Sequence, residues 1–375
     1  IVRGGHFLQA LRSHVSGRVV SFVMLAALLA TANTYGATLA ASLLLSRVGA
    51  RAIPLYFVLY AVLSIPVSVI FTQVIDRWRR PLVFSALLLT NAGAALVVAR
   101  IADTDFTPVF YGLFLAITLF EQLNYSVFYV LLADYFTSDE TNGSTGLIAV
   151  GMAIGGMAGG SMAGIGANFT SSAQLLYGVP ALLVLTFAIF LFVRRRTARL
   201  GEAEPQSEQN LWAGMASFLP LLSRYPIVAL LALGVFLNIF VQTVLEYQVL
   251  TAYAGRFSDE RELTSFLGAV IGVLNIISIA TGLFVTVPLL TRVGVARMNV
   301  AYPVLTISAF VGLGGSFSLP TAIYGHTVFD AWSRSVDAPI FASNYNAVPQ
   351  RFIGRVRIFN DGLIYPLAMA IAGGG

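Results

Sequence analysis

Amide and carboxylate side chains stand inside a long apolar stretch of this sequence. In "NIFVQTVLEYQVL" (238–250), Asn238, Gln242 and Glu246 follow one another at four-residue spacing, which places them on one face of a helix. A charge within a membrane-spanning helix costs roughly 2.5–3.5 kcal/mol, so such residues usually face a cavity or a partner. No cation in the same stretch can reach Glu246. We therefore predict that Glu246 faces a water-filled cavity, where it could take up a proton or a cation.

A second polar stripe lies in residues 320–342 and consists of His326, Asp330, Arg334 and Asp337. Two interpretations remain open. In the first, Arg334 binds an anionic group of a solute and the two aspartates line the same cavity. In the second, the three charged residues neutralise one another at helical spacing and form a structural clamp.

Two earlier apolar stretches carry polar residues as well. Residues 107–132 contain Glu121 and Asn124, three positions apart, and residues 19–45 contain a stripe of hydroxyl groups at three- and four-residue spacing, formed by Thr31, Thr34, Tyr35 and Thr38. We expect Glu121, Asn124, Tyr35 and Thr38 to face the same cavity as Glu246. Other stretches, such as 82–101, have almost no ionisable residues in their interiors.

The composition requires a membrane protein. Of the 375 residues, 57% are hydrophobic and 10% are charged, whereas soluble proteins have about 25% charged residues. Apolar stretches of about 18 or more residues, long enough to cross a bilayer as helices, recur along the whole chain. We predict an all-α polytopic protein with eleven spans, at 19–45, 53–75, 82–101, 107–132, 144–165, 175–193, 225–250, 264–290, 298–316, 320–342 and 359–374.

Arginine asymmetry predicts the orientation. All 22 basic residues are arginine, and most of those outside the spans fall on one side of the predicted membrane. Because cytoplasmic loops carry an excess of Lys and Arg, we place the N-terminus in the cytoplasm. This topology accounts for the net charge of +5, so we expect no nucleic acid as a partner. The expected partners are membrane lipids and a small solute.

The longest polar stretch, "RRRTARLGEAEPQSEQN" (194–210), separates six spans from five. We predict an N-terminal six-helix half at 1–193, a cytoplasmic linker with an interfacial helix at 194–224, and a C-terminal half at 225–375 that ends before a twelfth span. A weak repeat relates "VIDRWRRPL" (74–82) to "LLTRVGVAR" (289–297). Pseudo-symmetric halves are typical of secondary transporters, although any cytoplasmic loop can carry arginines.

Charged residues at the predicted cytoplasmic ends could form a gate, in which an acid of the fourth span pairs with arginines of the loop after the second. The candidates are Asp76, Arg77, Arg79, Arg80, Asp134 and Arg292. In the fifth span, glycines at 151, 155 and 159, and again at 156, 160 and 164, form two helix faces. Such faces predict close helix packing.

Three segments carry a family resemblance: "SLLLSRVGARAIPLYFVLYAVLSIPVSVIFTQVIDRWRRPLVF" (42–84), "VFYVLLADYFTSDETNGSTGLIAVGMAIGGMAGG" (127–160) and "RSVDAPIFASNYNAVPQRFIGRVRIFNDGLIYPLA" (334–368). They resemble the nucleotide transporter (ATP/ADP translocase) family, and more closely its free-living bacterial relatives, which are often fused to HEAT-repeat or cyclic-nucleotide-binding domains. The resemblance implies a six-plus-six bundle of the major facilitator type, a place in the bacterial cytoplasmic (inner) membrane, and a transport role for Glu246 and Glu121.

The family's intramembrane lysines are absent, because the corresponding segments read "LAASLLLS" (39–46) and "ASNYN" (342–346). An adenine nucleotide carries three or four negative charges, so a less charged solute fits this sequence better. We predict a secondary-active transporter that moves a small, anionic or nucleotide-like solute by alternating access. The alternative is a transporter-like sensor or scaffold that controls attached cytoplasmic domains.

An enzyme is not expected. The sequence contains no cysteine, no nucleophile–base arrangement, no phosphate-binding loop and no metal-ligand spacing, since its three histidines are scattered. We therefore predict neither a cofactor nor a metal.

Overall fold

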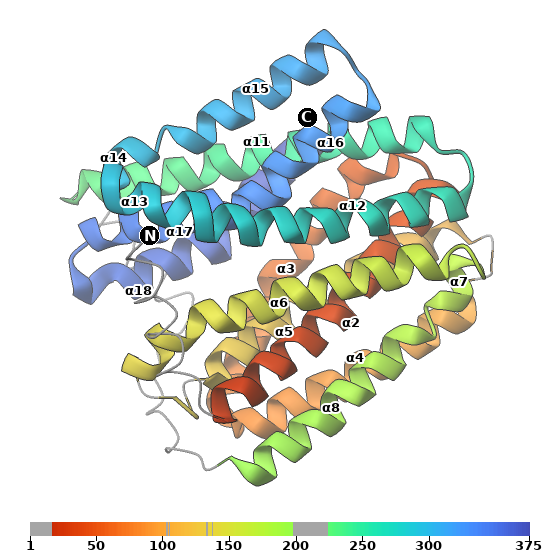
Figure 1. Ribbon diagram of the computed structural model, residues 1–375, viewed down its shortest axis with the longest axis horizontal. Helices are drawn as coiled ribbons and strands as arrows, with labels where there is room; N and C mark the ends of the chain where they lie inside the picture. The colour runs from red at the N-terminus through yellow and green to blue at the C-terminus, as the bar shows by residue number, and fades with distance from the viewer. Residues whose placement is uncertain (1–16, 103, 105, 133, 137, 198–223) are drawn as a thin grey trace. The chain divides into compact units, whose positions relative to one another are not determined.

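The computed structural model describes residues 17–102, 104, 106–132, 134–136, 138–197 and 224–375 (Figure 1). The described part of the chain is helical, without strands, as the sequence predicts. Its α-helices are α2 (Gly17–Arg47), α3 (Ala52–Arg77), α4 (Arg80–Ile101), α5 (Thr107–Leu132), α6 (Ser138–Gly166), α7 (Ser172–Leu175), α8 (Gly178–Arg196), α11 (Pro226–Arg256), α12 (Glu260–Thr281), α13 (Val287–Val293), α14 (Val295–Met298), α15 (Ala301–Gly315), α16 (Leu319–His326), α17 (Ala338–Asn344), α18 (Gln350–Phe359) and α19 (Tyr365–Gly374).

Nine helices in the described ranges are long and apolar enough to cross a membrane. They correspond to the first nine predicted spans. The last two predicted spans, 320–342 and 359–374, are helical as well, but each is interrupted by a π-helical segment, and the first contains the charged residues Asp330, Arg334 and Asp337. Large apolar side chains are exposed on many of these helices, as expected where lipid is the solvent. The prediction of an all-α polytopic protein is confirmed.

Three segments have the wider turns of a π-helix, namely η1 (Gly282–Thr286), η2 (Thr327–Asp337) and η4 (Asn360–Ile364). Each is followed, two residues later, by a proline: Pro288, Pro339 and Pro366. Proline lacks an N–H donor, and its ring clashes with the carbonyl four residues earlier. A widened turn is one way for a helix to accommodate this defect. Such turns are frequent at functional sites.

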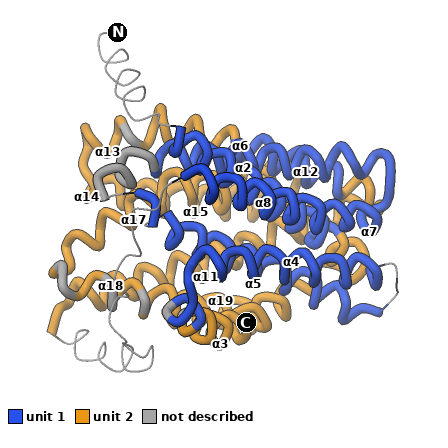
Figure 2. Tube along the Cα trace, turned by 90° about the horizontal axis from the view of Figure 1, so that it is seen from below, with its two compact units in different colours: residues 1–42, 74–205, 264–275 blue, residues 43–73, 206–263, 276–375 orange. Residues whose placement is uncertain are grey.

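Contacts divide the chain into two compact units (Figure 2). Unit 1 comprises residues 1–42, 74–205 and 264–275, and unit 2 comprises residues 43–73, 206–263 and 276–375. In unit 1, α4 packs against both α5 and α8. In unit 2, α11 packs against α16 and α19, and α15 packs against α16 and η2.

Within unit 1, the two glycine faces of α6 contact two different helices, as their spacing predicts. A Cβ on Gly155 would collide with the carbonyl oxygen of Ala27 in α2. On the other face, a Cβ on Gly160 would lie 3.0 Å from the carbonyl oxygen of Gly268 in α12. The absence of side chains therefore lets the backbone of α6 touch both neighbouring helices.

Candidate solute-binding site

A chain of hydrogen bonds connects α11 to η2 inside unit 2. The Gln242 amide nitrogen donates to Asn238 Oδ1 at 3.0 Å, and Asn238 Nδ2 donates to Asp337 Oδ2 at 2.6 Å. The Ser333 hydroxyl donates to Gln242 Oε1 at 3.4 Å. The structure thus brings together three of the residues predicted from sequence, Asn238, Gln242 and Asp337, although Asn238 and Asp337 are 99 residues apart in the chain.

These residues line a pocket of about 410 Å³. The pocket lies among α11, η2, α17 and the α18–η4 segment, and its polar lining consists of Asn238, Gln242, Ser333, Asp337, Tyr345, Arg357, Asp361 and Tyr365. The rest of the lining is apolar, including Ile239 and Phe341. A pocket of this volume that combines apolar walls with convergent polar groups is typical of a site for a small molecule.

Arg357 is the basic residue among the described residues of this pocket, and sequence reasoning misses it. Arg357 lies between the predicted tenth and eleventh spans, where an arginine is expected in a loop outside the membrane. Its guanidinium carbon lies 4.8 Å from the centre of the Tyr345 ring, a cation–π distance. The Tyr345 hydroxyl accepts a hydrogen bond from Asn360 Nδ2 at 2.9 Å. The four-residue spacing of Arg357 and Asp361 was the available signal.

Glu246 lies one turn beyond Gln242 on α11 and is half-buried. It forms no hydrogen bond and no ion pair with the described residues, and it does not line the 410 Å³ pocket. The charged group that acts on it most strongly is Asp330, also an acid. Glu246 is therefore a carboxylate inside a membrane-length helix. Its charged neighbour is an acid, and none of the described basic residues contacts it.

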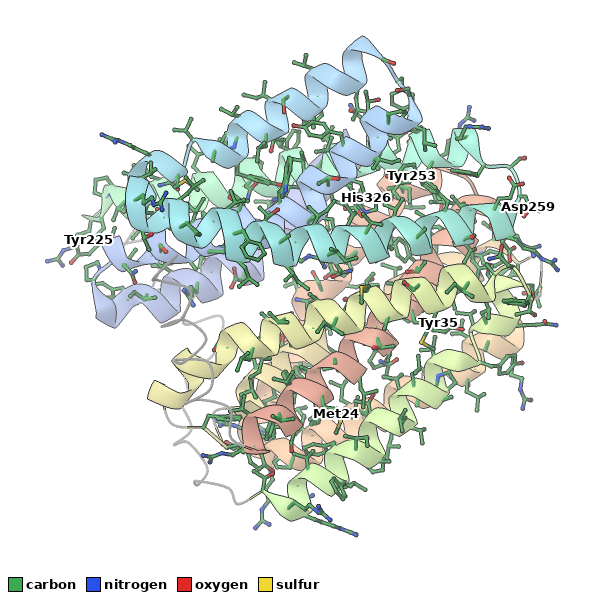
Figure 3. The ribbon with its side chains drawn as sticks, viewed as in Figure 1. Met24, Tyr35, Tyr225, Tyr253, Asp259 and His326 are labelled. Atoms are coloured by element: carbon green, nitrogen blue, oxygen red, sulfur yellow. The ribbon has the colours of Figure 1, made fainter. Side chains whose placement is uncertain are left out.

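Arg334 is neutralised by Asp330 on the same helical segment, with Nη2 and Oδ2 2.6 Å apart. Asp337 does not join this pair, because it binds Asn238 instead. The predicted stripe is thus split into the Asp330–Arg334 pair and Asp337, all of which lie within the widened turns of η2. Its first member, His326, is buried, and its Nδ1 lies 3.2 Å from the Tyr253 hydroxyl of α11 (Figure 3).

In unit 1, the polar residues predicted for the cavity are bound to their surroundings. Asn124 Nδ2 donates to Asn33 Oδ1 at 3.2 Å, and both residues are buried. The Tyr35 hydroxyl (Figure 3) donates to the carbonyl of Leu175 at 2.8 Å, and Thr38 bonds its own helix backbone. Glu121 is half-buried on α5.

One pair forms among the predicted gating residues. Arg80 Nη1 lies 2.6 Å from Asp134 Oδ1, and the Asp134 side chain is fully buried. Arg77, Arg79 and Arg292 are exposed, and the side chain of Asp76 lies outside the described residues. The sequence leaves Asp134 either solvated or paired with an arginine of this loop. The pair with Arg80 is present, and its role in a gate stays a prediction.

A cluster of buried hydroxyls connects α2, α7 and α12. Thr264 Oγ1 lies 2.8 Å from Ser172 Oγ and also forms a short hydrogen bond with Ser42 Oγ. All three residues are fully buried. Just before Thr264, Asp259 (Figure 3) caps α12 by accepting hydrogen bonds from the backbone N–H groups of Arg261 and Glu262. Along α12, Thr264 comes directly after the first helical turn. Gly268, which contacts α6, lies one turn further on.

A bundle of membrane-length helices with broken helices around a polar pocket is the architecture of a secondary transporter. The family comparison agrees: the model of the Major Facilitator Superfamily matches residues 20–373. The chain belongs to the Major Facilitator Superfamily. No curated protein matches the chain in sequence.

Solved structures show the same fold. A mutant of the nucleoside transporter NupG is similar with a TM-score of 0.74, at 12% identity, over 95% of this chain and 90% of that one. The POT family transporter PepTSo gives 0.62 at 13% identity, over 96% and 88%. A bacterial homolog of the human lysosomal transporter Spinster gives 0.56 at 16% identity, over 96% and 81%. The predicted major facilitator-type fold and the transporter class are confirmed, and the finer resemblance to ATP/ADP translocases stays a prediction.

Proposed function

We propose that this protein moves a small, nucleoside-sized polar solute with at most one or two negative charges, by alternating access. The observation that carries the proposal is the pocket of about 410 Å³ where α11, η2 and η4 come together. Amide groups of Asn238 and Gln242 offer hydrogen bonds to hydroxyl or base-like groups. Tyr345 and Tyr365 offer aromatic faces.

The charges of the pocket limit the charge of the solute. Among the described residues, its lining contains two carboxylates, Asp337 and Asp361, and one guanidinium, Arg357. The nearby Arg334 is neutralised by Asp330. A nucleoside triphosphate would bring three or four negative charges into surroundings that are already slightly negative, and like charges are strongly unfavourable at low dielectric. A nucleoside, or a relative with one or two negative charges such as a nucleoside monophosphate, is compatible with this arrangement. The similarity to the nucleoside transporter NupG supports the same solute class.

Glu246 is the coupling residue in this proposal. A carboxylate in a span without a described cationic partner is costly when ionised and gains stability when it takes up a proton. Its place on α11, one turn from the Gln242–Asn238 ladder, would let solute binding and protonation influence each other.

The remaining features of the proposal come from sequence. The halves 1–193 and 225–375 would rock about the solute, with 194–224 as their linker. The protein would lie in the bacterial cytoplasmic membrane with its N-terminus inside, since the arginine distribution supports this orientation. In this proposal the protein shares its fold and Glu246 with the nucleotide transporters that it distantly resembles. It does not share their specificity for polyphosphates, because it has no lysines to bind them.

Counterflow into proteoliposomes tests the proposal. Vesicles preloaded with unlabelled adenosine, AMP or ATP would be diluted into the labelled form of the same solute, with Glu246→Gln measured beside the wild type. We expect accumulation of adenosine or AMP and none of ATP. Accumulation of ATP would contradict the charge argument. No accumulation of any of the three would contradict the proposed solute class and favour the alternative of a sensor or scaffold that controls attached domains.

A further inference from the structure

We infer that Arg357 forms an anion subsite in the pocket, and that it binds a single carboxylate or phosphate group of the solute. The inference rests on the proposed function and deepens it, because it assigns the anionic group of the solute to a residue outside the stripe 326–337. One of the two interpretations of the sequence gives this role to Arg334.

Arg334 is poorly suited to the role. Its guanidinium already has a carboxylate partner, Asp330, at 2.6 Å. It is also absent from the lining of the 410 Å³ pocket. An incoming anion would have to displace Asp330, and Asp330 would then be left beside another acid, Glu246. Two carboxylates without their cation are strongly unfavourable in a low-dielectric environment.

Arg357 has free donors and a fixed position. It lines the pocket and is exposed. Within the described part of the chain it forms no hydrogen bond and no ion pair within 4 Å, although its charge is attracted to Asp361. The guanidinium carbon lies over the Tyr345 ring, 4.8 Å from its centre, and its N–H groups form no hydrogen bond with the described residues. These donors match the two oxygens of a carboxylate or phosphate group.

The support of Arg357 is itself fixed. The Tyr345 ring packs edge-on against Phe341 at 5.4 Å, and the Tyr345 hydroxyl accepts a hydrogen bond from the buried Asn360 of η4. The ring therefore holds the cation against a rigid surface. Such positioning reduces the entropy that is lost when a ligand binds.

Anion binding to the purified full chain tests the inference without knowledge of the solute. Thermal unfolding would be recorded against increasing sodium phosphate, and separately against sodium acetate, with sodium chloride at matched ionic strength as the reference. We expect at least one of the two anions to raise the unfolding temperature beyond chloride. Phosphate alone would identify a phosphate group, and acetate alone a carboxylate.

Two variants locate the site. Arg357→Gln is expected to weaken the apparent affinity for the anion about tenfold or more, since a hydrogen bond to a charged group is lost. Arg334→Gln, the matched control, should change it less than about twofold. No stabilisation by either anion, or equal stabilisation of the wild type and Arg357→Gln, would overturn the inference.

A second measurement does not depend on the folding of a variant. Phenylglyoxal modifies accessible arginines, and mass spectrometry would follow Arg357 and Arg334 in the wild type. The stabilising anion should slow modification of Arg357 and leave the rate at Arg334 unchanged, and equal rates at Arg357 with and without it would contradict the inference. If the wild type shows counterflow but binds neither anion, the subsite is contradicted and the proposed function stands. If anion binding depends on Arg357 but no solute shows counterflow, the proposed function is contradicted and the subsite stands.

Discussion

The contact between α6 and α12 predicts a large difference between two glycines of the same helix, Gly268 and Gly272. A Cβ on Gly268 would lie 2.5 Å from the backbone nitrogen and 2.6 Å from the Cα of Gly164, and it would also collide with the carbonyl oxygen of Gly160. A Cβ on Gly272 would have its nearest contact with the Ser161 hydroxyl, at 3.1 Å. The first obstacle is backbone, whereas the second is a side chain that can rotate.

The magnitude follows from these distances. Non-bonded carbon atoms normally stay about 3.5–4.0 Å apart, so Gly268→Ala must move two helices by about 1 Å. Overpacking of this kind costs typically about 1–3 kcal/mol. In both variants alanine regains about 0.5–1 kcal/mol of helix propensity. We therefore expect Gly268→Ala to be less stable than Gly272→Ala by about 1–3 kcal/mol.

The assay is thermal unfolding of the two variants and the wild type in the same detergent. Gly272→Ala should unfold at or slightly above the wild-type temperature, and Gly268→Ala at a temperature lower by a few degrees, by the usual relation between stability and midpoint. Equal unfolding temperatures for the two variants would refute the reasoning, because they would show that α6 and α12 are not in backbone contact at Gly268.

Two further predictions concern buried polar contacts, and both are measured by the same unfolding assay. Arg80→Ala removes the guanidinium that lies 2.6 Å from the buried Asp134 carboxylate and should cost about 1.5–3 kcal/mol, the contribution of a hydrogen bond to a charged group. Arg77→Ala, at an exposed position, should change stability by less than about 0.5 kcal/mol; similar losses would show that the contact of Arg80 with Asp134 contributes little. Thr264→Val removes the hydroxyl shared by two neighbouring helices and should cost about 1–3 kcal/mol. Its control, Thr243→Val, is equally buried but loses only a bond to its own helix backbone, so a larger loss at Thr243 would contradict this account.

Much of the architecture could be predicted because the bilayer imposes strong rules on sequence. The length of apolar stretches fixes the spans, and the two glycine faces of α6 appear directly in the spacing of Gly155 and Gly160. The hydrogen bond of Asn238 to Asp337 could be anticipated only in part. Polar residues of separate spans were expected to share a cavity, but which pairs touch depends on helix rotation, which spacing alone does not give.

The parts that could not be predicted depend on deviations from regular helix. The sequence analysis placed Asp330, Arg334 and Asp337 on one face by assuming α-helical turns. The turns of η2 contain more residues, so Asp337 is separated from the Asp330–Arg334 pair and binds α11 instead. The role of Arg357 also depends on a deviation from regular helix. Arg357 lies in α18 just before the π-helical segment η4, and this path of the chain brings it beside the ring of Tyr345.

The central claim is that this chain transports a solute and that Glu246, which has no cationic partner among the described residues, couples the transport to protons. The most direct test is uptake of labelled adenosine into proteoliposomes with an imposed pH gradient, for the wild type and for Glu246→Gln. The account predicts that an inwardly directed proton gradient drives accumulation in the wild type, and that Glu246→Gln folds normally but loses accumulation against a concentration gradient. Gradient-driven accumulation that is equal in the two proteins would contradict the role of Glu246.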